Sequence, residues 1–89
     1  MKLEHSEDKF SLMKDNEMIG FLQYGIVDQT MYVNGIVVDP EYRGQGLASD
    51  LLKAGVEFAR ENKYKIIPRC SYAASAFDRG GYEDVDARE

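Results

Sequence analysis

The sequence contains one cysteine and no tryptophan, and no apolar run approaches the roughly 18 residues that a membrane-spanning helix needs. One cysteine excludes an internal disulfide framework and is typical of a protein in a reducing compartment. The first residues, M-K-L-E-H-S-E-D, lack the apolar core of a secretory signal peptide. We therefore expect a soluble, cytoplasmic protein that does not associate with membranes.

Positive charge is also scarce, because 11 lysines and arginines stand against 16 acidic residues and leave a net charge of −5. Nucleic-acid binding needs an excess of basic residues, so we expect no nucleic-acid partner. The charge is unevenly distributed, however, since residues 43–69 carry a local balance of +3 and the rest of the chain −8. A local basic segment suits one small polyanionic ligand, although a helix face of ordinary mixed charge has the same composition.

A chain of 89 residues is short for two cores, and we expect one domain, residues 1–89. Its core should be thin, burying roughly 60 to 65% of the surface of the unfolded chain. We expect a monomer or a weak dimer and assign no metal site. The one histidine, His5, is a general base by residue type, but near the chain end and with no evident partner it is expected to be a solvent-exposed surface residue.

Apolar residues alternate through the first part of the chain and predict four β-strands in an antiparallel meander. A helical spacing follows, and a further strand after that helix indicates a parallel pair joined by a crossover. The predicted fold class is therefore α+β, with a mixed, mainly antiparallel sheet of about five strands, one main helix and one short C-terminal helix. The acidic tail from Tyr82 is expected to fray. The expected strands are residues 2–5, 9–13, 18–27, 30–38 and 64–69, and the expected helices are residues 45–62 and 70–79.

Two residues are expected to disturb the sheet. Pro68 cannot donate a ladder hydrogen bond, so pairing should fail around it and we expect a gap at that end of the sheet. Gly35 lies inside a strand, where glycine marks either a bulge or a simple relief of twist. A bulge would splay the strand and free a backbone group, and both readings of Gly35 stay open.

The segment Val37–Ala48 reads V-V-D-P-E-Y-R-G-Q-G-L-A and contains the main candidate site. Pro40 ends the strand, and Gly44 and Gly46 remove two side chains where a ligand would approach the backbone. The helix that follows offers unpaired N–H groups and the positive end of its dipole. Arg43 adds a donor fork suited to phosphate oxygens. An anion site is favoured over a plain strand-to-helix connection with a surface arginine.

The motif V-x-P-x-x-R-G-x-G-x-A, between a strand and an amphipathic helix, resembles the acyl-CoA-binding core of the GNAT N-acetyltransferase superfamily. The chain is most similar to its small single-domain members. The family signature R/Q-x-x-G-x-G/A is matched by Arg43, Gly46 and Ala48. The resemblance implies that acetyl-CoA or coenzyme A binds, with its pyrophosphate on the backbone amides of residues 43–48 and its pantetheine arm beside residues 36–38. The implied binding residues are Ile36, Val37, Val38, Arg43, Gly44, Gln45, Gly46, Leu47 and Ala48.

Two further residues are candidates for catalysis. Cys70 follows Arg69 at the expected start of a helix, where positive charge favours the thiolate, but a lone cysteine is often only a buried apolar residue. The resemblance implies that Cys70 lies near the coenzyme A thiol, where it either takes the acetyl group or lines the pocket. It also implies that Tyr72 protonates the departing thiolate. Ser71 is either a helix N-cap or a catalytic group.

The resemblance implies an acetyl-CoA-dependent N-acetyltransferase that moves an acetyl group to an unidentified small-molecule or peptide amine. The alternative is a module that binds coenzyme A or acyl-CoA without turnover. The two predictions share one binding site and differ in whether Cys70 and Tyr72 act chemically.

Overall fold

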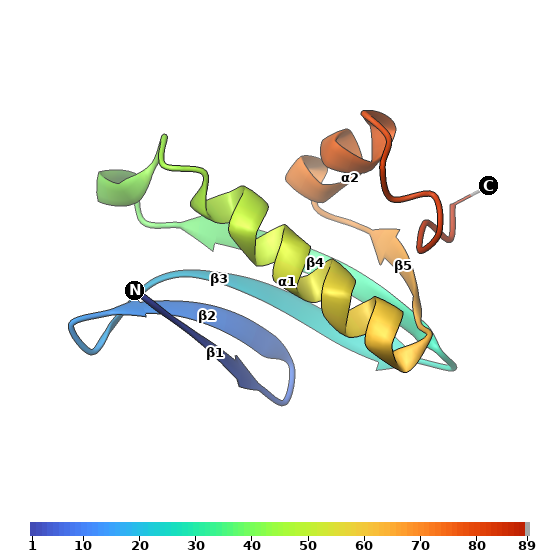
Figure 1. Ribbon diagram of the computed structural model, residues 1–89, viewed down its shortest axis with the longest axis horizontal. Helices are drawn as coiled ribbons and strands as arrows, with labels where there is room; N and C mark the ends of the chain where they lie inside the picture. The colour runs from blue at the N-terminus through green and yellow to red at the C-terminus, as the bar shows by residue number, and fades with distance from the viewer. Residues whose placement is uncertain (89) are drawn as a thin grey trace.

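A computed structural model describes residues 1–88 and shows an α+β fold, as the sequence predicts. A five-stranded sheet has the order β1-β2-β3-β4-β5, and α1 lies along one face of it, with α2 beside α1 over the β5 end (Figure 1). No helix in residues 1–88 has the length and apolar character to cross a membrane. The elements are β1 Lys2–Ser6, β2 Lys9–Lys14, β3 Glu17–Val27, β4 Thr30–Val38, the 3-10 helix η1 Pro40–Tyr42, α1 Leu47–Asn62, β5 Lys65–Pro68 and α2 Ser71–Asp78.

The first four strands form the expected antiparallel meander, and β5 pairs with β4 in parallel. Polar residues close two of its hairpins, with positive φ angles at Asp15 (51°) and Asn16 (67°) and at Asp28 (50°) and Gln29 (68°). Two successive residues of positive φ are typical of type I′ turns, whose twist matches that of paired strands. The polar turns of the sequence therefore fix the meander.

The core lies between the sheet and the helices. Leu22, Met31 and Leu51 are fully buried there. Gly55 permits the close approach of α1, because a Cβ at this position would lie 3.2 Å from Leu22 Cδ1. The contact fixes the height of α1 above β3 and β4, so the first turn of α1 has a defined position at the end of β4.

The strands β4 and β5 diverge where the sequence predicts a gap. Their pairing runs from Thr30–Lys65 to Val33–Pro68, after which β4 continues to Val38 paired with β3 only. The Val33 carbonyl accepts from the amides of both Arg69 (2.9 Å) and Cys70 (3.2 Å), and this shared acceptor ends the ladder. The predicted failure of pairing around Pro68 is confirmed.

The bulge interpretation of Gly35 is also confirmed, with the extra residue one position earlier. Gln23 pairs with Gly35, whereas Tyr24 pairs with Val33, so Asn34 is the additional residue in β4. The bulge therefore falls directly after Val33, where β5 turns away.

The expectation that the acidic tail frays is wrong. Val85 is 3% exposed and its carbonyl accepts from the Ile66 amide at 2.6 Å, while the Ala87 amide donates back to Ile66 at 2.9 Å. The free edge of β5 supplies these backbone partners. The side chain of Val85 occupies a core position, although its neighbours in the sequence are acidic. The Arg60 guanidinium adds two hydrogen bonds to the carboxylate of Asp84, at 2.8 and 3.1 Å.

His5 is exposed, as expected, but it has partners. Its Nε2 lies 2.5 Å from the Tyr24 hydroxyl and its ring stacks on Phe10 with centroids 3.9 Å apart. Burial, with the nearby Asp8 carboxylate and Tyr64, raises the pKa of Tyr24 above its usual value. The neutral phenol is therefore favoured as the partner of His5, and this contact attaches the otherwise exposed β1 to the core.

Candidate active site

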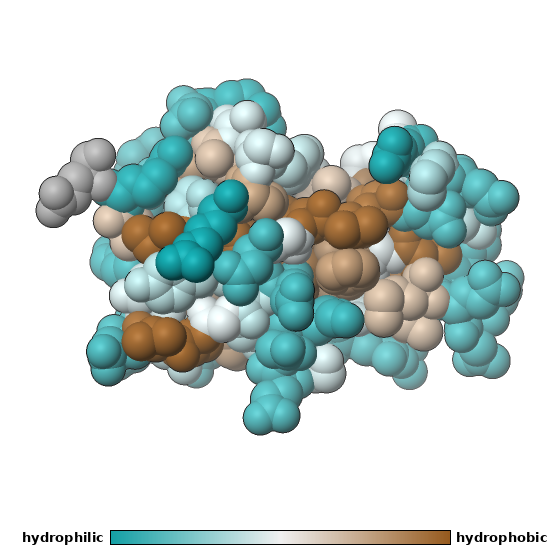
Figure 2. Space-filling view, turned by 180° about the vertical axis from the view of Figure 1, so that it is seen from behind, coloured by the Kyte–Doolittle hydropathy of each residue, from teal (hydrophilic) through white to brown (hydrophobic). Residues whose placement is uncertain are grey.

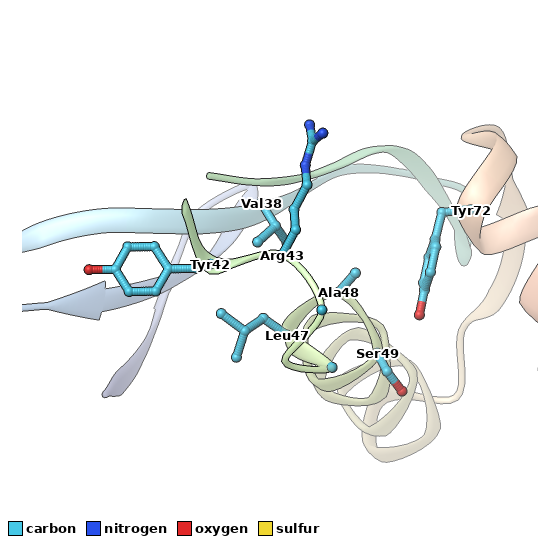
Figure 3. Close-up of a pocket in the computed structure, with 9 residues that line it drawn as sticks. Val38, Tyr42, Arg43, Leu47, Ala48, Ser49 and Tyr72 are labelled. Carbon is cyan, nitrogen blue, oxygen red and sulfur yellow. The ribbon is translucent and has the colours of Figure 1, made fainter. Parts of the chain in front are cut away.

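A pocket of about 220 Å³ lies between the end of β4, the loop after it, the first turn of α1 and the start of α2 (Figure 3). Tyr42 and Tyr72 stand on opposite sides of the first turn of α1 in this view. Six of the nine predicted binding residues line the pocket, and the predicted catalytic residue Tyr72 joins them. The lining residues are Val38, Tyr42, Arg43, Gly44, Gly46, Leu47, Ala48, Ser49 and Tyr72.

The loop that leads into α1 is shaped by local hydrogen bonds. The Asp39 carboxylate caps η1 by accepting from the Glu41 amide at 3.0 Å, and the Asp39 amide donates to the Ile19 carbonyl at 2.8 Å. Gly44 and Gly46 then have φ angles of +85° and +76°. These lie in the left-handed region of backbone conformation, which costs each non-glycine residue roughly 1 to 2 kcal/mol. The two glycines reverse the chain so that α1 starts facing the pocket.

The start of α1 has the properties of an anion site. Gly46 is the N-cap residue and supplies no side-chain hydrogen bond, so the first-turn N–H groups of α1 are not capped from within the loop. A Cβ placed on Gly44 or Gly46 would meet nothing within 4 Å, which leaves open space above both residues. Uncapped amides, a positive helix end and open space together fit a phosphate group.

Two cationic side chains lie at this loop. Arg43 is exposed, and its side chain extends away from the first turn of α1 in Figure 3. None of the salt bridges within residues 1–88 uses it, so its donor fork has no carboxylate partner there. Lys14 lies over the ring of Tyr42, with Nζ 5.1 Å from the centroid. Both charges favour an anion bound above the glycines.

The edge of β4 that β5 leaves unpaired extends from the pocket. Inter-strand hydrogen bonds alternate along an antiparallel pair, and the Asp39 amide bonds to β3, so the backbone groups of Ile36 and Val38 point to the other edge. That edge is the one that β5 leaves after Val33. Polar backbone groups therefore line the space between β4 and the start of α2, where an extended ligand could pair with them as an added strand.

The side chains of Val37 and Gln45 are outside the pocket lining, and Ile36 is half-buried beside the core; the binding predicted for all three through their backbone groups stays a prediction. Val37 is 50% exposed and lines a second pocket of about 220 Å³ with Met18 and Phe21. Alternation along a strand explains this, because Val37 faces the side opposite to its two neighbours. Apolar patches among hydrophilic side chains mark this helix-free side of the molecule in Figure 2.

Cys70 and Tyr72 both belong to the start of α2. Cys70, not Ser71, is the N-cap, since its Sγ accepts from the Ala73 amide at 3.3 Å and Ser71 is the first helical residue. Cys70 is half-buried against the core and is not part of the pocket lining, whereas Tyr72 is 36% exposed and does line it. The structure therefore brings Tyr72 to the anion site and leaves Cys70 at the junction of β4 and β5.

Sequence reasoning missed two lining residues, Tyr42 and Ser49. Tyr42 falls inside the motif, and Ser49 is three residues after Gly46, in the first turn of the helix. Both could have been predicted from their positions next to the two glycines. A loop that reverses at Gly44 and Gly46 brings the residues before and after it to the same pocket.

The chain belongs to the GCN5-related N-acetyltransferase family, whose model matches residues 9–85. It is 34% identical to a GCN5-like protein from Staphylococcus aureus, over 99% of this chain and 89% of that chain, with a TM-score of 0.80. No curated protein matches the chain.

Larger acetyltransferases share the fold. The ribosomal-protein-S18-alanine N-acetyltransferase of Escherichia coli is 22% identical over 82% of this chain, with a TM-score of 0.69, and the chain spans 50% of it. The PaiA N-acetyltransferase of Thermoplasma acidophilum, in complex with coenzyme A, is 17% identical over 82% of this chain, with a TM-score of 0.67 and 49% of that chain covered. The chain thus spans about half the length of these two enzymes.

Proposed function

We propose that this protein is an N-acetyltransferase that takes its acetyl group from acetyl-CoA and transfers it to an amine. The observation that carries the proposal is the continuity of one site: the uncapped start of α1 at Gly46 adjoins the unpaired edge of β4, which leads to Cys70. Family membership supports the same reaction class.

Binding follows from the two parts of this site. The first-turn amides of α1 at residues 47–49 hold the pyrophosphate, and Arg43 supplies a positive charge beside it. The backbone groups of Ile36 and Val38 pair with the pantetheine arm in the way an added strand would. The segment from Val38 to Val33 is about 16 Å long at the rise of a β-strand, which gives an extended arm a defined track.

The direct reaction forms one C–N bond and breaks one C–S bond. The amine nitrogen attacks the thioester carbonyl carbon, backbone N–H groups of β4 near Val38 stabilise the oxyanion, and the sulfur leaves as a thiolate. Tyr72 lines the pocket, and its hydroxyl donates a proton to that thiolate. The proton lost by the amine passes to a base or to water.

A two-step route uses Cys70. Its sulfur attacks the thioester carbonyl, which forms an S-acetyl bond on Cys70 and releases coenzyme A, and the amine then attacks that new thioester and restores the cysteine. The hydrogen bond from the Ala73 amide to Sγ, at 3.3 Å, and the start of α2 are oriented to stabilise negative charge on this sulfur. The position of Cys70 beside Val33, where the track ends, favours this route.

Calorimetric titration with acetyl-CoA and an assay of thiol release in the presence of amines test the function. Binding with amine-dependent thiol release is the expected result. Binding without release for any amine would favour the non-catalytic coenzyme A module, and the absence of binding at millimolar ligand would contradict both functions.

A further inference from the structure

Arg69 occupies a defined place at the end of the proposed track. It follows Pro68, the last residue of β5, and its amide donates to Val33 where the two strands part. Its guanidinium carbon lies 4.5 Å from the centroid of the Tyr32 ring, and Tyr32 pairs with Ile67, two residues before Arg69. Arg69 therefore lies on the same face of the sheet as Tyr32, the helix-free face opposite the buried Met31 and Val33, and it directly precedes Cys70 in the chain.

The guanidinium of Arg69 packs against the Tyr32 ring and forms no ion pair with a carboxylate of residues 1–88. Arg60 and Arg88 each bind acidic side chains, but no salt bridge among residues 1–88 involves Arg69. This occurs in a chain with 16 acidic residues and 11 basic ones, where carboxylates are plentiful. Stacking on an aromatic ring orients the guanidinium plane and leaves its N–H donors free for a ligand.

We propose that Arg69, oriented by Tyr32, binds a carboxylate of the acceptor, so that the acceptor is an amino acid or a closely related amine with a carboxylate a few bonds from its nitrogen. This assignment rests on the proposed function. One guanidinium fork matches one carboxylate in a bidentate pair, whereas a phosphate usually draws several cations. Because Arg69 directly precedes Cys70 at the end of the track, a carboxylate on its guanidinium would lie on the helix-free side of the gap where the two strands part.

The net charge of the protein does not by itself select such an acceptor. A protein of charge −5 repels anions and attracts cations at long range. A zwitterionic amino acid has no net charge and is subject to neither effect, so a local contact has to select it. Arg69 provides that contact with its fork, and Tyr32 gives the fork one orientation.

Nuclear magnetic resonance on the whole chain tests the assignment in two stages. The first stage saturates the protein with coenzyme A. If coenzyme A did not bind, the proposed function itself would be contradicted. The second titrates the saturated protein with N-acetyl-L-alanine, a product with a carboxylate, or with N-acetyl-L-alaninamide, its neutral counterpart. We expect the carboxylate compound to bind about 10-fold more tightly or better and to shift the Arg69 Nε–Hε resonance.

Matched variants separate recognition from other roles of Arg69. Arg69→Gln should abolish the preference for the carboxylate compound and leave the affinity for coenzyme A unchanged. Arg69→Lys keeps the positive charge beside Cys70 but not the fork, so most of the preference should still be lost. Equal binding of the two compounds, no binding of either to the coenzyme A complex, or an unchanged preference in Arg69→Gln would overturn the proposal while the acetyltransferase assignment stands.

Discussion

The Cys70 amide donates to the Val33 carbonyl at 3.2 Å, and the same carbonyl accepts from Arg69 at 2.9 Å. Two successive amides on one acceptor mean that the chain turns out of the sheet at this point. The unpaired edge of β4 begins here and leads, after Val38, to the uncapped start of α1. One backbone junction therefore sets both the end of the proposed acyl track and the position of its candidate nucleophile.

Substitution of Gly46 by aspartate should remove coenzyme A binding. Gly46→Asp places a negative side chain in the open space above the first turn of α1 and forces a non-glycine residue to a φ of +76°. We expect affinity for coenzyme A to fall at least about 10-fold, since like charges repel within the site. Calorimetry measures the change.

Gly81→Asp is the matched control, because Gly81 also has a positive φ, +98°, and a Cβ there would meet nothing within 4 Å. Both variants should lose roughly 1 to 2 kcal/mol of stability from the left-handed backbone. Only Gly46→Asp should lose affinity for coenzyme A; equal affinity in the two variants would remove the first turn of α1 from the binding site.

Replacement of Cys70 by serine tests the two-step route without loss of the helix cap. Serine is a good N-cap residue, so Cys70→Ser should keep α2 folded, whereas Cys70→Ala should lose about 1 kcal/mol with the cap. Incubation of the native protein with acetyl-CoA should add the mass of one acetyl group that excess thiol then removes, and Cys70→Ser should acquire no acetyl group at this position. Unchanged amine turnover in Cys70→Ser would exclude the cysteine from the mechanism.

Tyr72→Phe should slow the reaction and spare binding. The ring stays in the pocket wall while the hydroxyl that protonates the leaving thiolate is lost. We expect kcat to fall about 100-fold or more with little change in the affinity for coenzyme A, as for loss of a general acid. Tyr82→Phe is a suitable control, because Tyr82 stacks on Phe77 and does not line the pocket. A parallel loss of kcat in both variants would assign the effect to stability.

The docked tail should be released in acid. The hydrogen-bonded Arg60 guanidinium lowers the pKa of Asp84 below 3.8, and Arg88 lowers the pKa of Asp86 in the same way. A lowered folded-state pKa stabilises the docked tail above pH 3.8, and this contribution is lost as the pH falls through the folded value. The Ile66 and Ala87 amide resonances should therefore stay native at pH 5 and change below pH 3.8.

Asp84→Asn removes the carboxylate of that pair and should weaken docking of the tail at neutral pH. Asp28→Asn changes a turn residue with a positive φ that asparagine also accepts, so it serves as the charge-matched control. If the two variants affected the Ile66 amide equally, the ion pair would not be what holds the tail.

Local chemistry made much of the fold predictable from the sequence. The bounds of β4 are those expected, and the break at Pro68 was predicted from its lost donor, whereas a bulge was one of two interpretations that the sequence left open for Gly35. The candidate site was predicted from the ordered string around Gly44 and Gly46. Each of these features depends on neighbours in the chain.

Contacts between distant segments were not predictable in the same way. Docking of Val85 requires the free edge of β5, and the His5–Tyr24 contact joins residues 19 positions apart. Nothing near either residue in the sequence identifies its partner. The face on which the Val37 side chain lies, by contrast, follows from alternation along the strand, and this side chain is 50% exposed.

Residue-level titration with acetyl-CoA, followed through the backbone amide resonances, tests the central claim most directly. We predict that the largest shifts fall on the first turn of α1 at residues 47–49 and on Ile36 and Val38 of β4. A separate cavity of about 420 Å³, lined by Arg60, Lys65 and Asp84, should not respond. Shifts confined to that separate cavity, or none at millimolar ligand, would contradict the proposed binding site.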